Sequence, residues 1–181
     1  EVFGDTSRVS ARVQAIAAEN GGGGFAWTGQ AEERSKMWQA RHDAAWAAKA
    51  ARPGWGMWAT DVCVPISNLA ECILETQRDI VKTGLYAPIV GHVGDGNFHL
   101  TMMVNPDDPT YLPRAEALND RMIARAQNLG GTCTGEHGVG IGKIKYLYEE
   151  HGEAMSLMRS IKKAIDPDNI MNPGKIMGPI N

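Results

Sequence analysis

The dipeptide Asp95-Gly96 lies between two apolar segments and strongly limits how the middle of the chain can fold. Asp-Gly flanked by hydrophobic residues is a strong short-range signal for a β-hairpin with a two-residue turn. We therefore expect antiparallel strands over residues 86–93 and 98–104. Helical patterns surround this hairpin. The sequence thus predicts an α+β fold: a ferredoxin-like, mostly antiparallel sheet covered by helices, with additional C-terminal helices.

The other elements are expected from apolar spacing and from Gly and Pro stops. A first helix is expected after a cap at Thr6 or Ser7, ending at Asn20-Gly21. Another is expected between a cap at Ser67 and a stop at Gly84. Further helices are expected over residues 31–50, 113–129, 141–150 and 153–164, and further strands over residues 25–27 and 55–64.

The hairpin motif GHVGDGNFH (residues 91–99) contains two histidines. A two-residue turn at Asp95-Gly96 would place His92 directly opposite His99, and opposed residues point to the same face with Cβ atoms about 5 Å apart. Val93 and Phe98 would then face the core. Two imidazoles at that separation could bind one metal ion. The alternative is two surface histidines beside a tight turn.

The second glycine-rich motif, GTCTGEHG (residues 131–138), contains an acid and a histidine. Two imidazoles and one carboxylate can hold a divalent cation while leaving positions open for a substrate. Glu136 is therefore the third candidate ligand. Adjacent residues diverge in direction, so His137 is better suited to act as a base or to support the ligands. The alternative is a glycine-rich loop with an incidental charged pair. The glycines match neither the P-loop nor the dinucleotide fingerprint.

Arg41 falls on a Trp/Ala stripe of the helix expected over residues 31–50. Burying a guanidinium there would be costly without an anion, and arginine binds carboxylates through two parallel hydrogen bonds. Arg41 is thus a candidate substrate-carboxylate clamp. It could equally pair with Asp43, Asp61 or another acid, or extend to water.

Composition excludes several classes of partner. The net charge of −3 gives no reason to expect nucleic acid, and no apolar run approaches the length of a membrane span. The three cysteines form no CxxC pair, which favours a reducing compartment. We expect a protein in the cytoplasm or peripheral to an energy-transducing membrane. Since the chain starts at Glu1, we also expect it to be a piece of a longer protein.

The motifs GHVGDGNFH, GTCTGEHGVGIGK and DPDNIMNPGKI, in this order and spacing, resemble the C-terminal part of FAD-linked oxidases of the vanillyl-alcohol oxidase type. The segments RSKMWQARHDAAWAAKAARPGW and WATDVCVPISNL are also similar to that family, particularly to its D-lactate dehydrogenase (cytochrome) group. The resemblance implies that residues 1–181 form the cap or substrate domain of a two-domain flavoenzyme. The family's N-terminal FAD-binding domain would lie outside this sequence.

The resemblance also implies roles for individual residues. His92, His99 and Glu136 match the family's metal ligands, which would hold Zn, Mn or Fe. His137 matches its catalytic histidine, and Arg41 its carboxylate-binding arginine. The Asn-Pro motif of the family returns to the flavin, so Asn172 would contact FAD; without the resemblance, it reads as a turn residue before proline.

The implied activity is oxidation of a small D-2-hydroxy acid, with hydride transfer to FAD. Ala45 and Ala59 stand where relatives acting on longer diacids tend to carry polar or basic groups, which favours D-lactate. A cytochrome or quinone would accept the electrons. Alternatives are a D-2-hydroxyglutarate- or glycolate-type dehydrogenase subunit, a non-catalytic metal- or carboxylate-binding module, and a metal-dependent hydrolase. The isolated fragment is expected to be inactive.

Overall fold

The computed structural model describes residues 6–179, which divide into two compact units with a boundary between Ala47 and Ala48. We describe each unit by itself. The first contains α1 (Thr6–Glu19) and α2 (Ala31–His42), neither of which has a fully buried residue. The helix α3 (Ala44–Ala50) crosses the boundary. The second unit contains the sheet and the remaining helices.

The sheet is built around the long strand β4 (Asn97–Val104). Along one edge, β1 (Gly56–Ala59) and β2 (Val62–Cys63) pair with β4 in the same antiparallel register, so they are two parts of one interrupted strand. Along the other edge, β3 (Ile89–His92) pairs with β4 as a hairpin. Thr132 forms an isolated bridge to Cys63 on the outer side of β2. The resulting order, Thr132 segment–β1/β2–β4–β3, is that of a ferredoxin-like βαββαβ unit.

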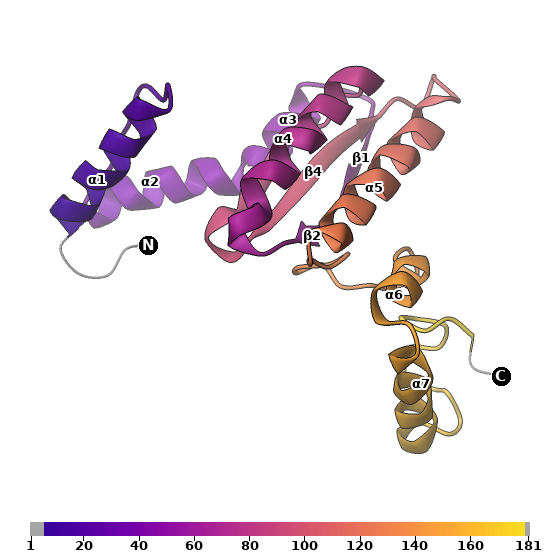
Figure 1. Cartoon of the computed structure of the whole chain (residues 1–181). Helices are drawn as coiled ribbons and strands as arrows, with labels where there is room; N and C mark the ends of the chain where they lie inside the picture. Colours follow the sequence, from indigo (N-terminus) through magenta and orange to yellow (C-terminus); the bar gives the residue numbers. More distant parts are fainter. Residues whose placement is uncertain (1–5, 180–181) are drawn as a thin grey trace. The chain divides into compact units, whose positions relative to one another are not determined.

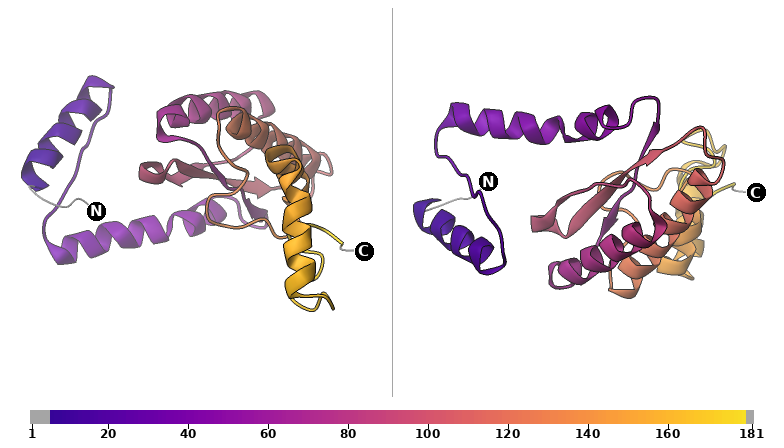
Figure 2. Two further views of the ribbon diagram at one scale, coloured as in Figure 1. Left: turned by 60° about the horizontal axis from the view of Figure 1, so that its bottom comes forward. Right: turned by 90° about the horizontal axis from the view of Figure 1, so that it is seen from above.

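Two helices cover one face of this sheet (Figures 1 and 2). They are α4 (Ile66–Thr83) and α5 (Tyr111–Asn128). Alternate sheet residues face them and form the apolar core together with side chains of both helices: Val62, Val64, Phe98, Leu100, Met102, Leu69, Cys72, Leu118, Met122 and Ile123. Because strand side chains alternate, the intervening residues of β2 and β4 point to the opposite face.

After α5 the chain forms α6 (Ile144–His151) and α7 (Ala154–Ile165), the additional C-terminal helices predicted from the sequence. Tyr146 and Leu147 of α6 and Met155 of α7 are buried in the core cluster. The structure therefore confirms the predicted α+β class and its ferredoxin-like layer of helices on an antiparallel sheet.

Several local predictions were wrong. The strand expected over residues 55–64 is interrupted at Thr60 and Asp61, and the helix expected over residues 31–50 is broken at Asp43. Residues 25–27 form no strand. The fourth helix begins at Ile66 after Pro65 rather than after a Ser67 cap, since proline fixes φ and favours a helix start. Its predicted end at Gly84 is confirmed by a left-handed glycine there.

Candidate metal centre

The predicted hairpin register was wrong by two residues. The chain turns through a short 3-10 helix, η1 (Val93–Asp95), and the left-handed Gly96, so His92 lies opposite Asn97, and Val90 lies opposite His99. Four loop residues are used instead of two. Val93, expected in the core, is therefore exposed on this turn.

Despite the wrong register, both histidines lie on the predicted face of the sheet. Side-chain direction alternates along a strand, so a shift of two residues leaves every side chain on its original face. His92 and Asn97 are opposed, and Asn97 and His99 are two apart on β4. Both imidazoles therefore lie on the side of the sheet away from α4 and α5, with ring centroids 6.2 Å apart.

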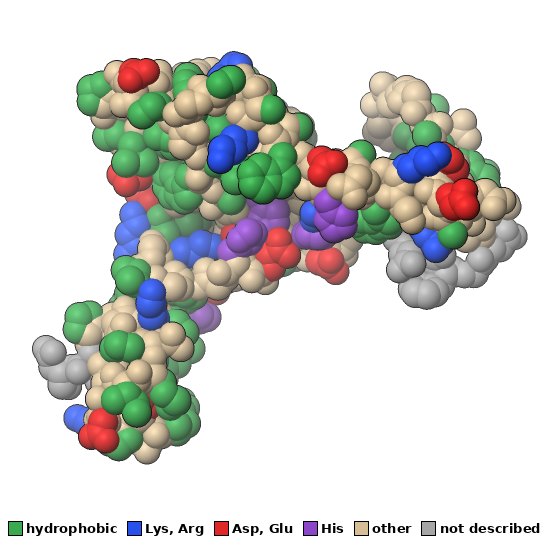
Figure 3. Space-filling model, turned by 180° about the vertical axis from the view of Figure 1, so that it is seen from behind, with side chains coloured by type: hydrophobic (Ala, Val, Ile, Leu, Met, Phe, Trp, Pro, Cys, Tyr) green, Lys and Arg blue, Asp and Glu red, His purple; other side chains and the backbone are tan. Residues whose placement is uncertain are grey.

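Glu136 joins the two histidines from the glycine-rich loop. Its Oε1 lies 3.0 Å from Nε2 of His99, and its Oε2 lies 3.7 Å from Nε2 of His92. One donor atom from each of the three residues lies within 4.8 Å of the other two. The structure thus brings together the three residues that the sequence singled out as candidate metal ligands. Figure 3 shows histidine and acidic side chains next to each other on one face.

The orientation of the His99 ring suits a cation. Nδ1 lies 3.0 Å from the carbonyl oxygen of Thr60, which can only accept, so Nδ1 donates its hydrogen and the neutral ring presents a lone pair at Nε2. Nε2 is buried and has no hydrogen-bond partner among the described residues, although the Glu136 carboxylate is close. An orphaned lone pair facing a carboxylate fits a positively charged ion between them.

Asp61 also belongs to this site, although its place there was not predicted from the sequence. It lies at the break between β1 and β2, opposite His99, and is buried. Its Oδ2 accepts hydrogen bonds from the backbone N–H groups of Gly135, Glu136 and His137, at 2.9, 3.1 and 2.9 Å. The available signal was an aspartate inside an apolar strand sequence, where this residue type is uncommon.

Further donors surround the Asp61 carboxylate. Thr134 Oγ1 donates to Oδ2 at 2.7 Å, and Lys143 Nζ lies 3.3 Å from the same oxygen. Asn97 Nδ2 donates to Oδ1 at 2.8 Å. Burial alone would raise the pKa of Asp61, but the hydrogen bonds from His137 N–H, Thr134 and Asn97 and the Lys143 charge hold it well below its ordinary value. The Asp61 carboxylate is therefore negatively charged although it is buried.

His137 lies beside the candidate ligands rather than apart from them. Its Nε2 is 3.3 Å from Oε1 of Glu136, and its ring contacts the His99 ring edge-on with centroids 4.9 Å apart. Half of its side chain remains exposed, at 50%. An imidazole with this exposure, next to the candidate ligands, can reach a proton on a bound molecule.

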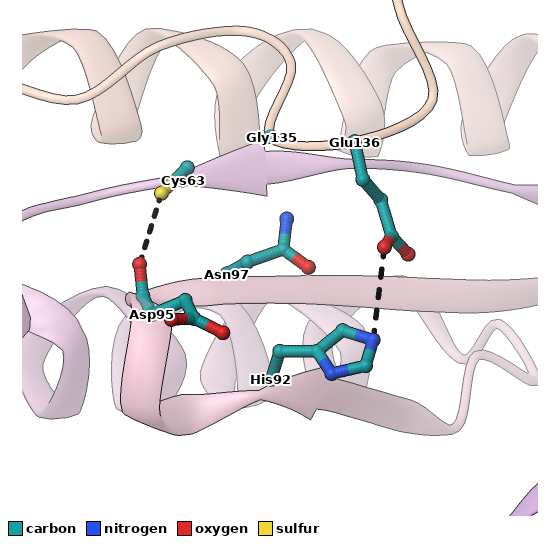
Figure 4. Close-up of a pocket in the computed structure, with 6 residues that line it drawn as sticks. All are labelled: Cys63, His92, Asp95, Asn97, Gly135 and Glu136. Carbon is teal, nitrogen blue, oxygen red and sulfur yellow. Dashed lines mark hydrogen bonds and ion pairs between the residues drawn. The ribbon is translucent and has the colours of Figure 1, made fainter.

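A pocket of about 230 Å³ opens beside this cluster. Figure 4 shows its lining residues: Cys63, His92, Asp95, Asn97, Gly135 and Glu136. The Asn97 side chain lies between the Cys63 strand and the His92 strand, on the same side as the Glu136 carboxylate. The pocket is large enough for a small organic acid and adjoins the histidine–glutamate cluster directly.

Arg41 and Asn172 are the two remaining candidate residues. Arg41 lies in the last turn of α2, within the first unit, and it is exposed, as are its neighbours on that helix. Its role as a clamp for a substrate carboxylate stays a prediction. Asn172 is exposed in the C-terminal loop and has a left-handed φ of 47°. Its carbonyl accepts a hydrogen bond from the N–H of Lys175, so it forms a turn. Its role toward a flavin stays a prediction.

A ferredoxin-like sheet with a histidine–glutamate cluster on the face away from α4 and α5 defines the class of domain. Residues 4–176 match the model of the family described as FAD linked oxidases, C-terminal domain. The chain belongs to this family, as the sequence motifs predicted.

Similar curated proteins come from several eukaryotes. The chain is 48% identical over 163 residues to a probable mitochondrial D-lactate dehydrogenase of Danio rerio, covering 90% of this chain and 33% of that protein. It is 46% identical to a mitochondrial D-lactate dehydrogenase (cytochrome) 1 of Saccharomyces cerevisiae, covering 91% and 28%. It is 44% identical to a mitochondrial D-lactate dehydrogenase (cytochrome) of Arabidopsis thaliana, covering 92% and 30%. The chain thus spans about a third of the length of these relatives.

A solved structure supports the fold. The 4-ethylphenol oxidase from Gulosibacter chungangensis, in complex with isoeugenol, superposes with a TM-score of 0.57 at 19% identity, covering 84% of this chain and 32% of that one. At this identity the likeness concerns the fold alone.

Within residues 6–179, no helix combines the length and apolar character needed to cross a membrane.

Proposed function

We propose that residues 1–181 form the substrate- and cation-binding domain of an FAD-dependent dehydrogenase that oxidises D-lactate to pyruvate. An FAD-binding domain of the same protein would supply the flavin. Membership of the FAD-linked oxidase family and the names of the similar proteins support this proposal. The observation that carries it is the convergence of His92, His99 and Glu136 beside a pocket, with His137 next to Glu136 and His99.

The donor set is suited to a divalent ion. Two imidazole nitrogens and a carboxylate are a ligand combination used by Zn, Mn and Fe. The buried lone pair of His99 also favours a bound cation. His99 Nε2 and Glu136 Oε1 lie 3.0 Å apart, a spacing at which both atoms can coordinate one ion. A bound cation would supply Lewis acidity, lowering the pKa of a substrate hydroxyl, and FAD would accept a hydride.

The other residues would orient the substrate and remove its proton. His137 is proposed as the general base, because its ring adjoins the ligands and stays partly exposed. Arg41 is proposed to bind the substrate carboxylate, and Asn172 to contact the flavin. The proposal for Arg41 rests on the chemistry of guanidinium and on the family motif, since α2 belongs to the separate first unit.

A small substrate is favoured by the residue at position 59, on the face of the sheet that carries the cluster. Ala59 pairs with Thr101 at the end of β1 and points to the same face as Asp61 and His99. A methyl group there cannot bind a second carboxylate, in contrast to a basic side chain. We propose D-lactate rather than a 2-hydroxy diacid on this ground.

The electron acceptor is proposed to be a cytochrome, as the names of the yeast and plant relatives state for those proteins. A quinone is the other acceptor considered. We place the protein in the cytoplasm or at the surface of an energy-transducing membrane; the fish, yeast and plant relatives are named as mitochondrial.

The test is to express the protein with its FAD-binding domain and to follow reduction of an artificial electron acceptor. We expect turnover with D-lactate, little with L-lactate or D-2-hydroxyglutarate, and loss of turnover after chelation with recovery on adding Zn²⁺ or Mn²⁺. Preference for glycolate or for a diacid would overturn the substrate, and chelator-resistant turnover would overturn the cation.

A further inference from the structure

We infer that Asp61 is the positioning residue of the centre: its carboxylate holds the Glu136–His137 loop on the sheet and fixes the amide of Asn97. This inference rests on the proposed function, because Glu136 and His137, which Asp61 holds, are the proposed ligand and the proposed base. Asp61 is not among the residues that line the pocket, so it acts through the residues that it holds.

The loop is tied to the sheet through one oxygen. Oδ2 of Asp61 receives the N–H groups of Gly135, Glu136 and His137. Successive N–H groups that converge in this way form a nest, a backbone arrangement that binds anions. Here the anion is a buried side chain from the central sheet, so the two residues that supply a ligand and a base are positioned by one carboxylate.

The close fit at Gly135 shows how tightly the loop sits on Asp61. A Cβ atom built on Gly135 would lie 2.2 Å from Asn97 Nδ2 and 3.2 Å from Asp61 Oδ1. Only glycine leaves room for this junction. The separation of Asp61 and the loop by more than 70 positions in the sequence means that the junction exists only in the folded chain.

The second effect of Asp61 acts on Asn97. Asn97 Nδ2 donates to Asp61 Oδ1 at 2.8 Å and to the carbonyl oxygen of Val62 at 2.9 Å. These two hydrogen bonds fix the orientation of the amide, so that Oδ1 of Asn97 points away from Asp61. That oxygen is buried and has no hydrogen-bond partner among the described residues, and Asn97 lines the pocket with His92 and Glu136. Asp61 thus presents an additional oxygen acceptor toward the space in which a cation or its bound water would lie.

The variant Asp61→Asn removes the charge of residue 61 while keeping the size of its side chain. The remaining oxygen of the new amide must face the loop, where several donors converge on the position of Oδ2. Its new NH₂ group then faces Asn97 Nδ2, donor against donor. Asn97 has to turn its amide, which would place NH₂ instead of an oxygen at the pocket. The loop loses a charged acceptor at the same time.

The first experiment measures hydrogen–deuterium exchange by mass spectrometry on the protein including its FAD-binding domain, without added metal. For Asp61→Asn we expect exchange in peptides covering residues 132–143 to rise on the order of 10–100-fold, because charged hydrogen bonds protect these amides. The matched control is Asp79→Asn, which removes a partly buried carboxylate paired with Arg121 and Arg125. It should leave exchange by local opening over residues 132–143 at the wild-type rate, because its partners Arg121 and Arg125 lie on α5, even though the fold as a whole is destabilised.

The second experiment titrates Co²⁺ into the same proteins and follows its visible d–d absorption. Asp61→Asn should weaken Co²⁺ binding about 10–100-fold and alter the absorption bands, as loss of a supporting contact does in other centres. Asp79→Asn should change neither. Thr134→Val removes a single donor to Asp61 and should give a smaller change of the same kind, which keeps the test open if Asp61→Asn does not fold.

Wild-type exchange over residues 132–143 in both Asp61→Asn and Thr134→Val would overturn the inference, as would wild-type Co²⁺ affinity and bands in both. Faster exchange in a protein that binds no Co²⁺ even as the wild type would support the positioning of the loop by Asp61. That result would overturn the proposed cation function instead.

Discussion

The Nε2 atom of His99 lies 3.0 Å from Oε1 of Glu136, while Nδ1 of the same ring donates to the carbonyl oxygen of Thr60. The ring is 7% exposed, so its orientation is set by the sheet and not by water. A lone pair and a carboxylate facing each other repel unless a cation or a proton lies between them. This relationship underlies the first prediction.

Replacing His99 with Ala should abolish retention of a divalent cation. Loss of a ligand should exceed the effect of losing a supporting contact, so we expect at least about a 100-fold weaker affinity. Equilibrium dialysis with metal analysis would measure it. His151→Ala is the control, since His151 lies on α6 and pairs with Glu150. Equal cation content in the two variants would contradict the assignment of His99.

Replacing His137 with Ala should separate chemistry from cation binding. Removal of a general base should lower kcat by about 10²–10⁴, while cation content stays close to that of the wild type. Glu136→Ala should have the opposite effect, with a larger loss of cation content than of kcat. Steady-state kinetics and metal analysis on the protein that includes the flavin domain would test both. Near-normal turnover in both variants would disprove the proposed roles.

Asp79 should make the free energy of unfolding pH-dependent. Burial acts to raise its pKa, but the hydrogen bonds and charges of Arg121 and Arg125 outweigh it, so the folded-state pKa is lowered. The group therefore stabilises the fold above its unfolded pKa, near 4, and this stabilisation is lost as the pH falls further.

Asp79→Asn should accordingly reduce the free energy of unfolding by about 1–3 kcal/mol at pH 7, because Arg125 loses a charged partner. The difference from the wild type should shrink as the pH is lowered below about 4. Chemical denaturation at pH 7 and pH 3 would measure it. A constant difference at both pH values would show that the Asp79 charge is not responsible.

Gly96→Ala should destabilise the hairpin turn. Gly96 has a φ of 74°, and a Cβ atom there would lie 2.0 Å from the carbonyl oxygen of Val64. The left-handed backbone alone costs about 1–3 kcal/mol for a non-glycine residue, and the contact adds to this. Gly94→Ala is the matched control in the same turn, since a Cβ atom added there would meet nothing within 4 Å among the described residues. Thermal unfolding of both variants would show whether the loss is confined to Gly96→Ala.

The sequence determined the α+β class, most helix positions and the identity of the clustered residues. Alternation along β4 placed His99 on the face opposite Phe98, and this conclusion survived a wrong register because a shift of two residues keeps the face. The motifs of the two glycine-rich segments were sufficient to identify the family.

Only the tertiary structure revealed Asp61 and the orientation of His99. The Asp61 carboxylate meets the loop around Gly135 across a separation of more than 70 residues, and nothing local to either segment specifies that contact. The tautomer of His99 depends on the carbonyl of Thr60, in the break between β1 and β2. Periodicity and turn signals describe local preferences, whereas hydrogen bonds between distant segments form only once the sheet has assembled; that is why the candidate ligands could be named from the sequence and their support could not.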